Sequence, residues 1–400
     1  MRGGILSHME VEFISLAVIV IVAAAVPLIA NRIPKKLIPE TVLLLIAGAV
    51  FGPHALGVVQ VTDSVSLLSD LGMAFLFLLA GYEIEPRNLT GRIGRTSILT
   101  WLISFGIACA IIMGILGGET GDIGSIAASI ALTTTAIGTL MPILAERGIL
   151  GTRVGDLVLS FGTYGEIMPI LAIALLLTTR AKWVTVVVLL VFAGIAVLVG
   201  WRAKSFRKTG NRVYAFLVDR ADSGSQTLVR VTICLLICLV AISAIFNLDI
   251  ILGAFAAGFV LRYVVPEGNR SLEQKLEAIG YGFLIPLFFV VSGAGIDLSA
   301  IVAKPLMLIV FIVLLMVVRF VPIMVALRIG RETRDLPWSD SVTVAFYCTT
   351  ALPLIVAVTN VAVSAGAMQP STASIMVAAG AVSVFLMPLL ASICQRAVKS

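Results

Sequence analysis

The sequence predicts an all-helical membrane protein with thirteen transmembrane helices. Of its 400 residues, 60% are apolar and only 12% are charged, which is about half the charged fraction of a soluble domain. The charged residues gather between apolar runs of about 17–25 residues, the length that crosses a hydrocarbon core of about 30 Å. A membrane β-barrel has shorter segments of alternating apolar residues, so the pattern excludes a barrel.

The apolar runs place the helices in order along the chain. The first run is followed by Asn-Arg-Ile-Pro-Lys-Lys rather than by a cleavage site, so we expect a retained helix and not a signal peptide. The connections between runs are short except for residues 202–227. The predicted spans cover residues 13–30, 38–58, 66–82, 96–117, 123–145, 154–178, 182–201, 228–246, 249–265, 278–296, 305–328, 341–363 and 373–395.

The basic residues predict the orientation of these spans. With the N-terminus outside, 23 of the 28 Lys and Arg residues lie in inside connections and 4 lie outside. Cytoplasmic loops carry such an excess, so we expect the N-terminus outside and the C-terminus in the cytoplasm of a plasma-membrane protein. The basic character of the chain therefore reflects the membrane surface and does not indicate nucleic acid binding.

Two ionisable residues lie deep inside predicted spans. Glu166 is in the sixth span and Arg319 is in the eleventh, each about 15–18 Å from the membrane surface. A lone charge in hydrocarbon costs several kcal/mol, so we expect the two side chains to face each other or one water-filled cavity. They either form an ion pair that only orders helix packing or belong to an ion or proton pathway, and intramembrane charges favour the pathway.

Two spans carry a polar cluster followed by a helix-breaking proline. In the fifth span Thr133, Thr134 and Thr135 precede Pro142, and in the twelfth a similar cluster precedes Pro353. This second cluster consists of Cys348, Thr349 and Thr350. Threonine and proline also kink ordinary membrane helices. Their matching positions favour discontinuous helices, whose hydroxyl and carbonyl oxygens suit a hard cation.

The two clusters are seven spans apart, which predicts an internal repeat. Residues 13–178 form the first six-helix repeat, residues 182–201 form a linking helix, and residues 228–395 form the second repeat. A repeat of six spans followed by one linking span puts the two halves in opposite orientations, as in inverted-repeat transporters. We expect one transmembrane domain over residues 1–400 without a cytosolic regulatory domain.

Several segments in this order resemble the monovalent cation:proton antiporter-2 family, the sodium/proton and potassium-efflux exchangers. The resemblance runs along the whole chain, and the order and spacing of the segments make it specific. The segments read PETVLLLIAGAVFGPHALGVV, LGMAFLFLLAGYEIEPRNL, ALTTTAIGTLMPILAERG, LGAFAAGFVL and IPLFFVVSGAGIDL.

The resemblance implies roles for the intramembrane residues. Glu166 matches the carboxylate that carries the ion or the proton, Arg319 matches its basic partner, and the broken fifth and twelfth spans cross beside them. Thr163 and Tyr164 precede the carboxylate and are candidates for hydrogen bonds near it. Relatives usually have an Asp preceded by a polar residue, whereas this chain has Gly165 before its Glu.

The predicted function is secondary antiport of Na⁺ or K⁺ against protons. One carboxylate can hold a cation or a proton but poorly both, so a single acid predicts electroneutral exchange by alternating access. Glu166 and Thr134 are the predicted ligands of the transported monovalent cation. No cofactor is expected, and the resemblance implies a homodimer in the lipid bilayer.

Other functions remain open at this point. A sodium-coupled symporter of an organic anion would want a larger cavity with more polar groups, and a non-transporting sensor or scaffold could keep the same fold. An enzyme is the weakest alternative, because the spans contain no paired aspartates, no His-Glu-x-x-His motif and no Ser/His pair.

Overall fold

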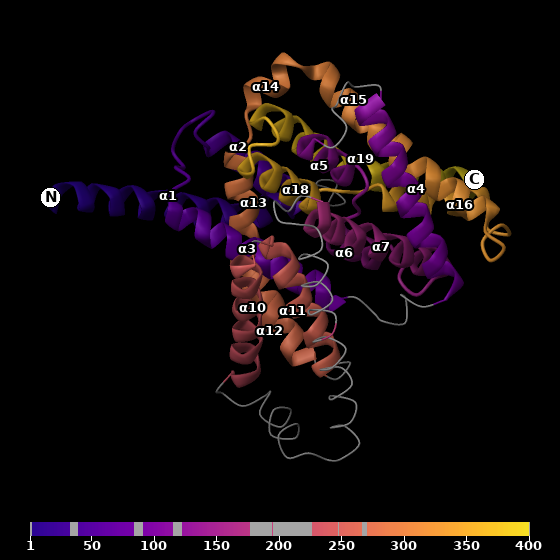
Figure 1. Cartoon of the computed structure of the whole chain (residues 1–400), viewed down its shortest axis with the longest axis horizontal. Coiled ribbons are helices and arrows are strands. Elements are labelled where there is room, and N and C mark those ends of the chain that lie inside the picture. Colours follow the sequence, from indigo (N-terminus) through magenta and orange to yellow (C-terminus); the bar gives the residue numbers. More distant parts are fainter. Residues whose placement is uncertain are drawn as a thin grey trace, which may run out of the picture. The chain divides into compact units, whose positions relative to one another are not determined.

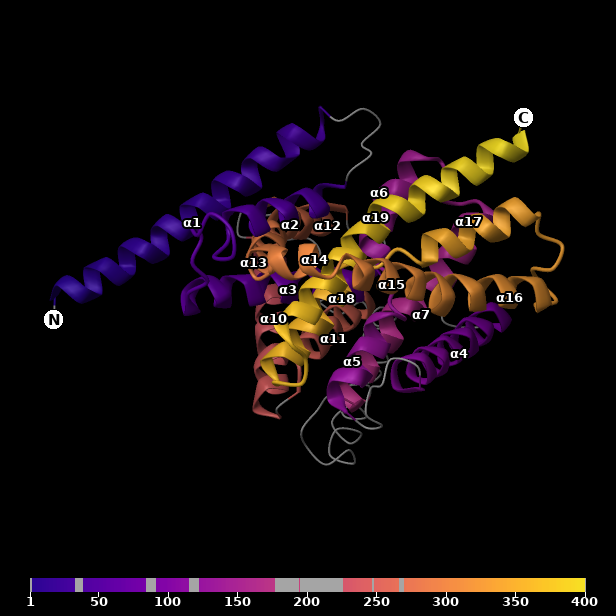
Figure 2. The same cartoon turned by 90° about the horizontal axis from the view of Figure 1, so that it is seen from above.

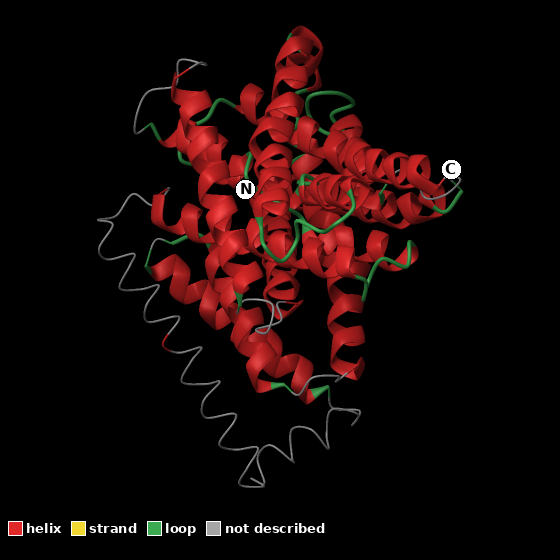
Figure 3. Cartoon of the chain, turned by 90° about the vertical axis from the view of Figure 1, so that its right-hand side faces the viewer, coloured by secondary structure: helices red, strands yellow, loops and turns green. Residues whose placement is uncertain are grey.

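A computed structural model of the chain describes residues 2–32, 39–83, 91–114, 122–176, 194, 226–246, 248–265 and 270–399. The described part consists of helices and loops (Figure 3). Two helices contain a widened π turn, η2 (Gly280–Leu284) and η3 (Met316–Phe320). The α-helices are α1 (Arg2–Ala30), α2 (Glu40–Phe51), α3 (Asp63–Glu83), α4 (Arg92–Gly114), α5 (Ile123–Ala131), α6 (Ile137–Glu146), α7 (Arg153–Leu176), α10 (Thr227–Ile245), α11 (Ile250–Val264), α12 (Arg270–Ile279), α13 (Ile285–Ala294), α14 (Leu298–Ala303), α15 (Pro305–Leu315), α16 (Val321–Ile329), α17 (Trp338–Cys348), α18 (Pro353–Ser364) and α19 (Pro370–Lys399).

The described residues contain nine helical segments that are long and apolar enough to cross a membrane. The chain is thus a helical protein with many membrane-spanning segments, as its composition predicts. The predicted count of thirteen spans is not reached within this described part. The predicted linking helix, 182–201, lies outside the described residues except for residue 194.

One predicted span is shorter than expected, and another matches its prediction to within one residue at each end. The second was predicted over residues 38–58, but α2 has 12 residues and ends at Phe51. Gly52 and Pro53 follow, and proline lacks the N–H that would continue the helix. The ninth predicted span forms α11, which has 15 residues and begins after Asp249, whose side chain accepts a hydrogen bond from the Ile251 N–H.

The chain divides into two compact units. The first unit comprises Met1–Val61, Glu85–Leu177 and Val290–Ser400, and the second comprises Thr62–Ile84 and Thr178–Phe289. Both units combine segments that are distant in sequence. All residues of the candidate site belong to the first unit.

Close packing of glycine against backbone holds the second unit together. Its main contact joins α3 and α11, and α10 also packs against α11. A Cβ atom at Gly258 would overlap the Leu78 carbonyl, and one at Gly81 would overlap the Phe255 carbonyl. Small residues at these positions let the two helices approach closely, which is how membrane helices gain packing energy.

Helix α7 lies in the core of the first unit. Helix α7 packs against α4 and α17, while α5 packs against α18, and α19 covers both α17 and α18 (Figures 1 and 2). Gly48 of α2 lies against the backbone of Val290, so this glycine lets the two segments pack closely. The two helices that were predicted to be interrupted, now α5–α6 and α17–α18, therefore both belong to this unit.

Candidate functional site

The first interruption lies at the predicted threonine cluster. α5 ends at Ala131 and α6 begins at Ile137, so the break precedes Pro142, which lies inside α6. The Thr133 hydroxyl donates to the Ile130 carbonyl at 2.7 Å, and the Thr134 hydroxyl donates to the Ala131 carbonyl at 2.9 Å. Such local hydrogen bonds replace the bonds of the next helical turn and help to end α5.

The second interruption lies between α17 and α18. α17 ends at Cys348, and Pro353 is the first residue of α18, where its missing N–H is not needed. Proline also keeps the residue before it out of the helical region, and Leu352 has a φ of −143°. Thr349, the residue after α17, donates its hydroxyl hydrogen to the Ala345 carbonyl of α17 at 2.7 Å.

Hydrogen bonds join the two breaks. They involve backbone groups that would be bonded within a helix if the helices were continuous. The Ala136 N–H donates to the Thr350 carbonyl at 2.9 Å, and the Thr135 hydroxyl donates to the Cys348 carbonyl at 2.6 Å. Backbone groups in a membrane interior need such partners, because each unsatisfied group costs several kcal/mol. The interruptions are therefore one joint structure at the centre of the first unit.

Helix α7 packs onto this junction at Gly165. The Thr135 N–H donates to the Gly165 carbonyl at 2.9 Å. A Cβ atom at Gly165 would overlap the Arg319 guanidinium and would lie 2.5 Å from the Thr135 hydroxyl oxygen. Only glycine fits at position 165 without movement of a neighbouring side chain.

Glu166 is the next residue of α7 and is only 8% exposed. The predicted neighbours Thr163 and Tyr164 are also buried on the same helix. Glu166 is thus a carboxyl group inside the protein, one residue from the backbone that meets the α5–α6 break. This position agrees with the predicted placement beside the broken helices, while its role as a carrier stays a prediction.

Arg319 lies in η3 and is 1% exposed. Its Nη2 donates to the Thr135 hydroxyl at 2.8 Å and to the Phe161 carbonyl at 3.1 Å, and its Nε donates to the Cys348 carbonyl at 3.3 Å. Pro322 follows in the first turn of α16 and cannot bond the carbonyl four residues earlier, which accounts for a widened turn here.

The guanidinium therefore joins both breaks to α7. Its contact with Cys348 places a positive charge at the C-terminal end of the half-helix α17, where the helix dipole is negative. This arrangement stabilises the charge inside the protein through carbonyl and hydroxyl acceptors. Its role as the counter-charge of Glu166 stays a prediction.

The predicted lining residues differ in their hydrogen bonding. The Cys348 thiol lies 3.7 Å from the Val158 carbonyl. The Thr350 hydroxyl is fully buried and has no hydrogen-bond partner among the described residues. Thr350 is therefore the predicted lining residue whose hydroxyl is not engaged within the described part of the chain.

One residue of the junction was missed by the sequence analysis. The Ser383 hydroxyl of α19 accepts a hydrogen bond from the Ala351 N–H at 3.1 Å. Its own hydrogen lies between the Ala351 carbonyl at 3.0 Å and the Gly380 carbonyl at 2.7 Å. Ser383 thus satisfies the backbone of the α17–α18 break. A single serine within the apolar run Gly-Ala-Val-Ser-Val-Phe was the only sign of it in the sequence.

Comparison with known proteins supports the same class of membrane protein. The family described as "Sodium/hydrogen exchanger, transmembrane" matches residues 17–393. A putative Na⁺/H⁺ antiporter of Bacillus subtilis, YjbQ, is 26% identical over 87% of this chain and 57% of its own length. A probable Na⁺/H⁺ antiporter of Methanocaldococcus jannaschii is 25% identical over 81% of both chains. The chain thus spans little more than half of the Bacillus relative.

The fold has a counterpart among solved structures. The sodium proton antiporter MjNhaP1 of Methanocaldococcus jannaschii, solved at pH 8, superposes with a TM-score of 0.64 at 16% identity. The superposition covers 96% of this chain and 97% of that one. The two proteins share their fold over nearly their whole lengths.

Proposed function

The chain belongs to the sodium/hydrogen exchanger family, and on this premise we propose that it exchanges Na⁺ or K⁺ for protons with Glu166 as the shared carrier. The observation that carries the proposal is the burial of this carboxyl group on α7, one residue from the point where two interrupted helices meet. Ionisable residues in membrane interiors are costly and mark ion or proton pathways. The Bacillus and Methanocaldococcus relatives, named a putative and a probable Na⁺/H⁺ antiporter, support the same proposal.

Competition at one carboxyl group couples the two ions. Glu166 binds either a proton or the cation. The hydroxyl oxygens of Thr134, the second predicted ligand, and of Thr350 supply further oxygen ligands to the cation. Both loaded forms neutralise the carboxylate, whereas the empty form is charged and does not cross the low-dielectric interior. One acid per site yields one cation per proton, which is electroneutral exchange.

The interrupted helices supply the structural basis for alternating access. Half-helix ends and unwound backbone at the membrane centre offer dipoles and carbonyl oxygens to an ion, as in inverted-repeat transporters. We assign residues 13–178 and 228–395 to the two inverted repeats. On the same premise we propose that the chain belongs to the antiporter-2 subfamily and forms a homodimer. We also propose that it lies in the plasma membrane with its N-terminus outside.

The test is exchange by the Glu166→Gln variant in proteoliposomes with a pH-sensitive dye. The amide is isosteric but carries no exchangeable charge, so we expect cation-driven proton flux to fall to the background of empty liposomes. The matched control is Asp156→Asn, which changes an exposed carboxylate on the same helix and should retain wild-type flux. Wild-type exchange by Glu166→Gln would show that another group carries the ions.

A further inference from the structure

Helix α7 contains a proline in its interior, close to the candidate carrier. Pro169 is buried and lies three residues after Glu166 in this 24-residue helix. A proline inside a helix lacks the N–H that would bond the carbonyl four residues earlier, and its ring clashes with that carbonyl. The carbonyl four residues before Pro169 belongs to Gly165. Helix α7 therefore has a backbone acceptor without its helical partner at the residue just before Glu166.

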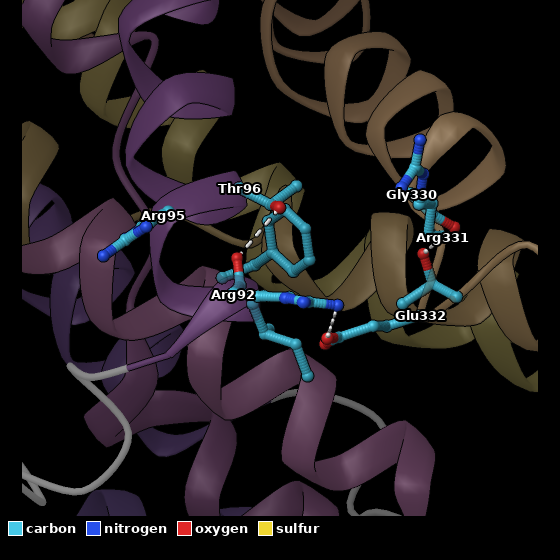
Figure 4. A pocket seen from close by; sticks show the side chains of 9 residues that line it. Arg92, Arg95, Thr96, Gly330, Arg331 and Glu332 are labelled. Carbon is cyan, nitrogen blue, oxygen red and sulfur yellow. Dashed lines mark hydrogen bonds and ion pairs between the residues drawn. The ribbon is translucent and has the colours of Figure 1, made fainter.

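A pocket beside the first half of α7 stops short of this carbonyl. It has a volume of about 320 Å³, and the Arg92 side chain reaches across it to Glu332 at 3.7 Å (Figure 4). Its lining includes Phe161, about one turn before Gly165, but not Gly165 itself, which is buried. A partner for the freed carbonyl must therefore come from another helix, as is usual for prolines in membrane helices.

That partner is the N–H of Thr135, which donates to the Gly165 carbonyl at 2.9 Å. The hydroxyl of the same threonine is held from two other directions. It donates to the Cys348 carbonyl at 2.6 Å and accepts from the Arg319 Nη2 at 2.8 Å. The carbonyl freed by Pro169 thus joins α7 to a residue that already binds the second break and the arginine.

The residues of α7 around this hydrogen bond share one face of the helix. At 3.6 residues per turn, four positions lie within an arc of about 100°. They are Gly162, Gly165, Glu166 and Pro169. A Cβ atom at Gly162 would lie 2.9 Å from the Ile137 Cγ1 of α6. The face that includes Glu166 therefore packs directly against the α5–α6 break.

We propose that Pro169 is a positioning residue of the carrier site, an inference that rests on the proposed function of Glu166. By leaving the Gly165 carbonyl free for the Thr135 N–H, it fixes the backbone next to Glu166 against the α5–α6 break. The carboxyl group and the oxygen ligands of the break then keep one geometry while access to them alternates. Pro169 itself contacts neither ion.

Hydrogen–deuterium exchange of the protein in detergent tests the hydrogen bond without any transport measurement. Pro169→Ala supplies an N–H that competes for the Gly165 carbonyl. The amide of Thr135, resolved by fragmentation of its peptide, should then lose its partner and exchange about tenfold faster than in wild type. Unchanged protection of Thr135 would overturn the proposal.

Thermal unfolding separates positioning from a purely structural role. Alanine restores a helical hydrogen bond and removes the clash of the proline ring, so the unfolding temperature of Pro169→Ala should equal or exceed that of wild type. A variant that unfolds at a lower temperature, with exchange reduced in proportion, would assign Pro169 to stability alone and overturn the proposal.

Transport measurements test the consequence for the carrier. A displaced ligand weakens cation binding, so the half-saturating Na⁺ concentration of Pro169→Ala should rise about tenfold while the maximal exchange rate changes less than about twofold. The matched control is Pro27→Ala, which replaces a proline inside α1 and should keep wild-type Na⁺ dependence and Thr135 protection. Wild-type Na⁺ dependence in Pro169→Ala would overturn the positioning role.

Moving the proline by one residue separates the freed carbonyl from the bend of the helix. Met168→Pro/Pro169→Ala keeps a proline in α7 but frees the carbonyl of Tyr164 in place of that of Gly165. This variant should share the defect of Pro169→Ala, whereas wild-type Na⁺ dependence would show that the bend alone matters.

Failure of the carrier itself has a different signature. Glu166→Gln would then keep its exchange, while the faster exchange of the Thr135 amide in Pro169→Ala would be unaffected.

Discussion

At the scale of single residues, the candidate site depends on Gly165 and Arg319. The guanidinium lies directly against the glycine backbone and binds the Thr135 hydroxyl beside it. The space that a polar side chain at position 165 would need is therefore filled by the arginine and the threonine. This leaves Glu166 as the single acid of the local sequence Gly-Thr-Tyr-Gly-Glu.

Gly165→Ala tests this packing. The added methyl group overlaps the Arg319 guanidinium and lies 2.8 Å from the Thr135 Cβ, so we expect a loss of about 1–3 kcal/mol in stability. Thermal unfolding in detergent measures the effect. The control is Gly106→Ala on α4, where a Cβ meets no atom within 4 Å, and this variant should be as stable as wild type or slightly more stable.

Arg319→Lys separates the charge of this residue from its geometry. A lysine keeps the charge but is a point donor, and it cannot reach the Thr135 hydroxyl and the carbonyls of Cys348 and Phe161 together. We expect Arg319→Ala to lose about 3 kcal/mol or more of stability and Arg319→Lys to recover only part. If lysine restored wild-type unfolding temperature and exchange, charge alone would explain the residue.

At the scale of elements, the interrupted helices act as one structure. Each break leaves backbone N–H and C=O groups that lack helical partners. The Ala136–Thr350 and Thr135–Cys348 hydrogen bonds between the two breaks supply partners to some of these groups. Residues of other helices bind further backbone groups of the α17–α18 break: Arg319 of η3 binds the Cys348 carbonyl, and Ser383 of α19 binds Ala351.

Ser383→Ala tests how much the α17–α18 break depends on α19. Removing this hydroxyl leaves both the N–H and the carbonyl of Ala351 without their side-chain partner, so we expect stability to fall by about 1–3 kcal/mol. Thermal unfolding measures this loss, with Ser129→Ala as the control that removes a hydroxyl bonded within its own helix. Equal unfolding temperatures for the two variants would show that Ser383 does not support the break.

At the scale of the whole molecule, the distribution of charge predicts the orientation in the membrane. Basic residues concentrate in alternate connections, 23 inside and 4 outside in the predicted topology. Lys304 belongs to the outside set and Arg331 to the inside set. Both side chains are exposed in the structure, so chemical labelling can reach them.

Single cysteines at these two positions test that orientation in a variant without the native cysteines. A membrane-impermeant maleimide added to intact cells should label Lys304→Cys fully and Arg331→Cys only after the membrane is opened. The expectation follows from the excess of Lys and Arg on the cytoplasmic side. The reverse labelling pattern would invert the proposed orientation and with it the direction of exchange.

Much of the fold follows from local properties that a sequence displays directly. Long apolar runs identify membrane helices because hydrocarbon excludes unpaired backbone and charge. The threonine clusters and Pro353 mark both interruptions, since hydroxyls and a missing N–H act on the adjacent turn. The short α2 was mispredicted because apolar residues continue past Gly52 and Pro53, although the helix cannot.

The sequence alone thus determined the membrane class, the broken helices and two buried ionisable residues, Glu166 and Arg319. Only the tertiary structure decided what these residues contact. Arg319 binds carbonyls of Cys348 and Phe161, and Ser383 binds the backbone of Ala351, which no spacing in the sequence indicates. Backbone groups freed by a break bind whichever element lies nearest in space, and that neighbour is set by helix packing between segments distant along the chain.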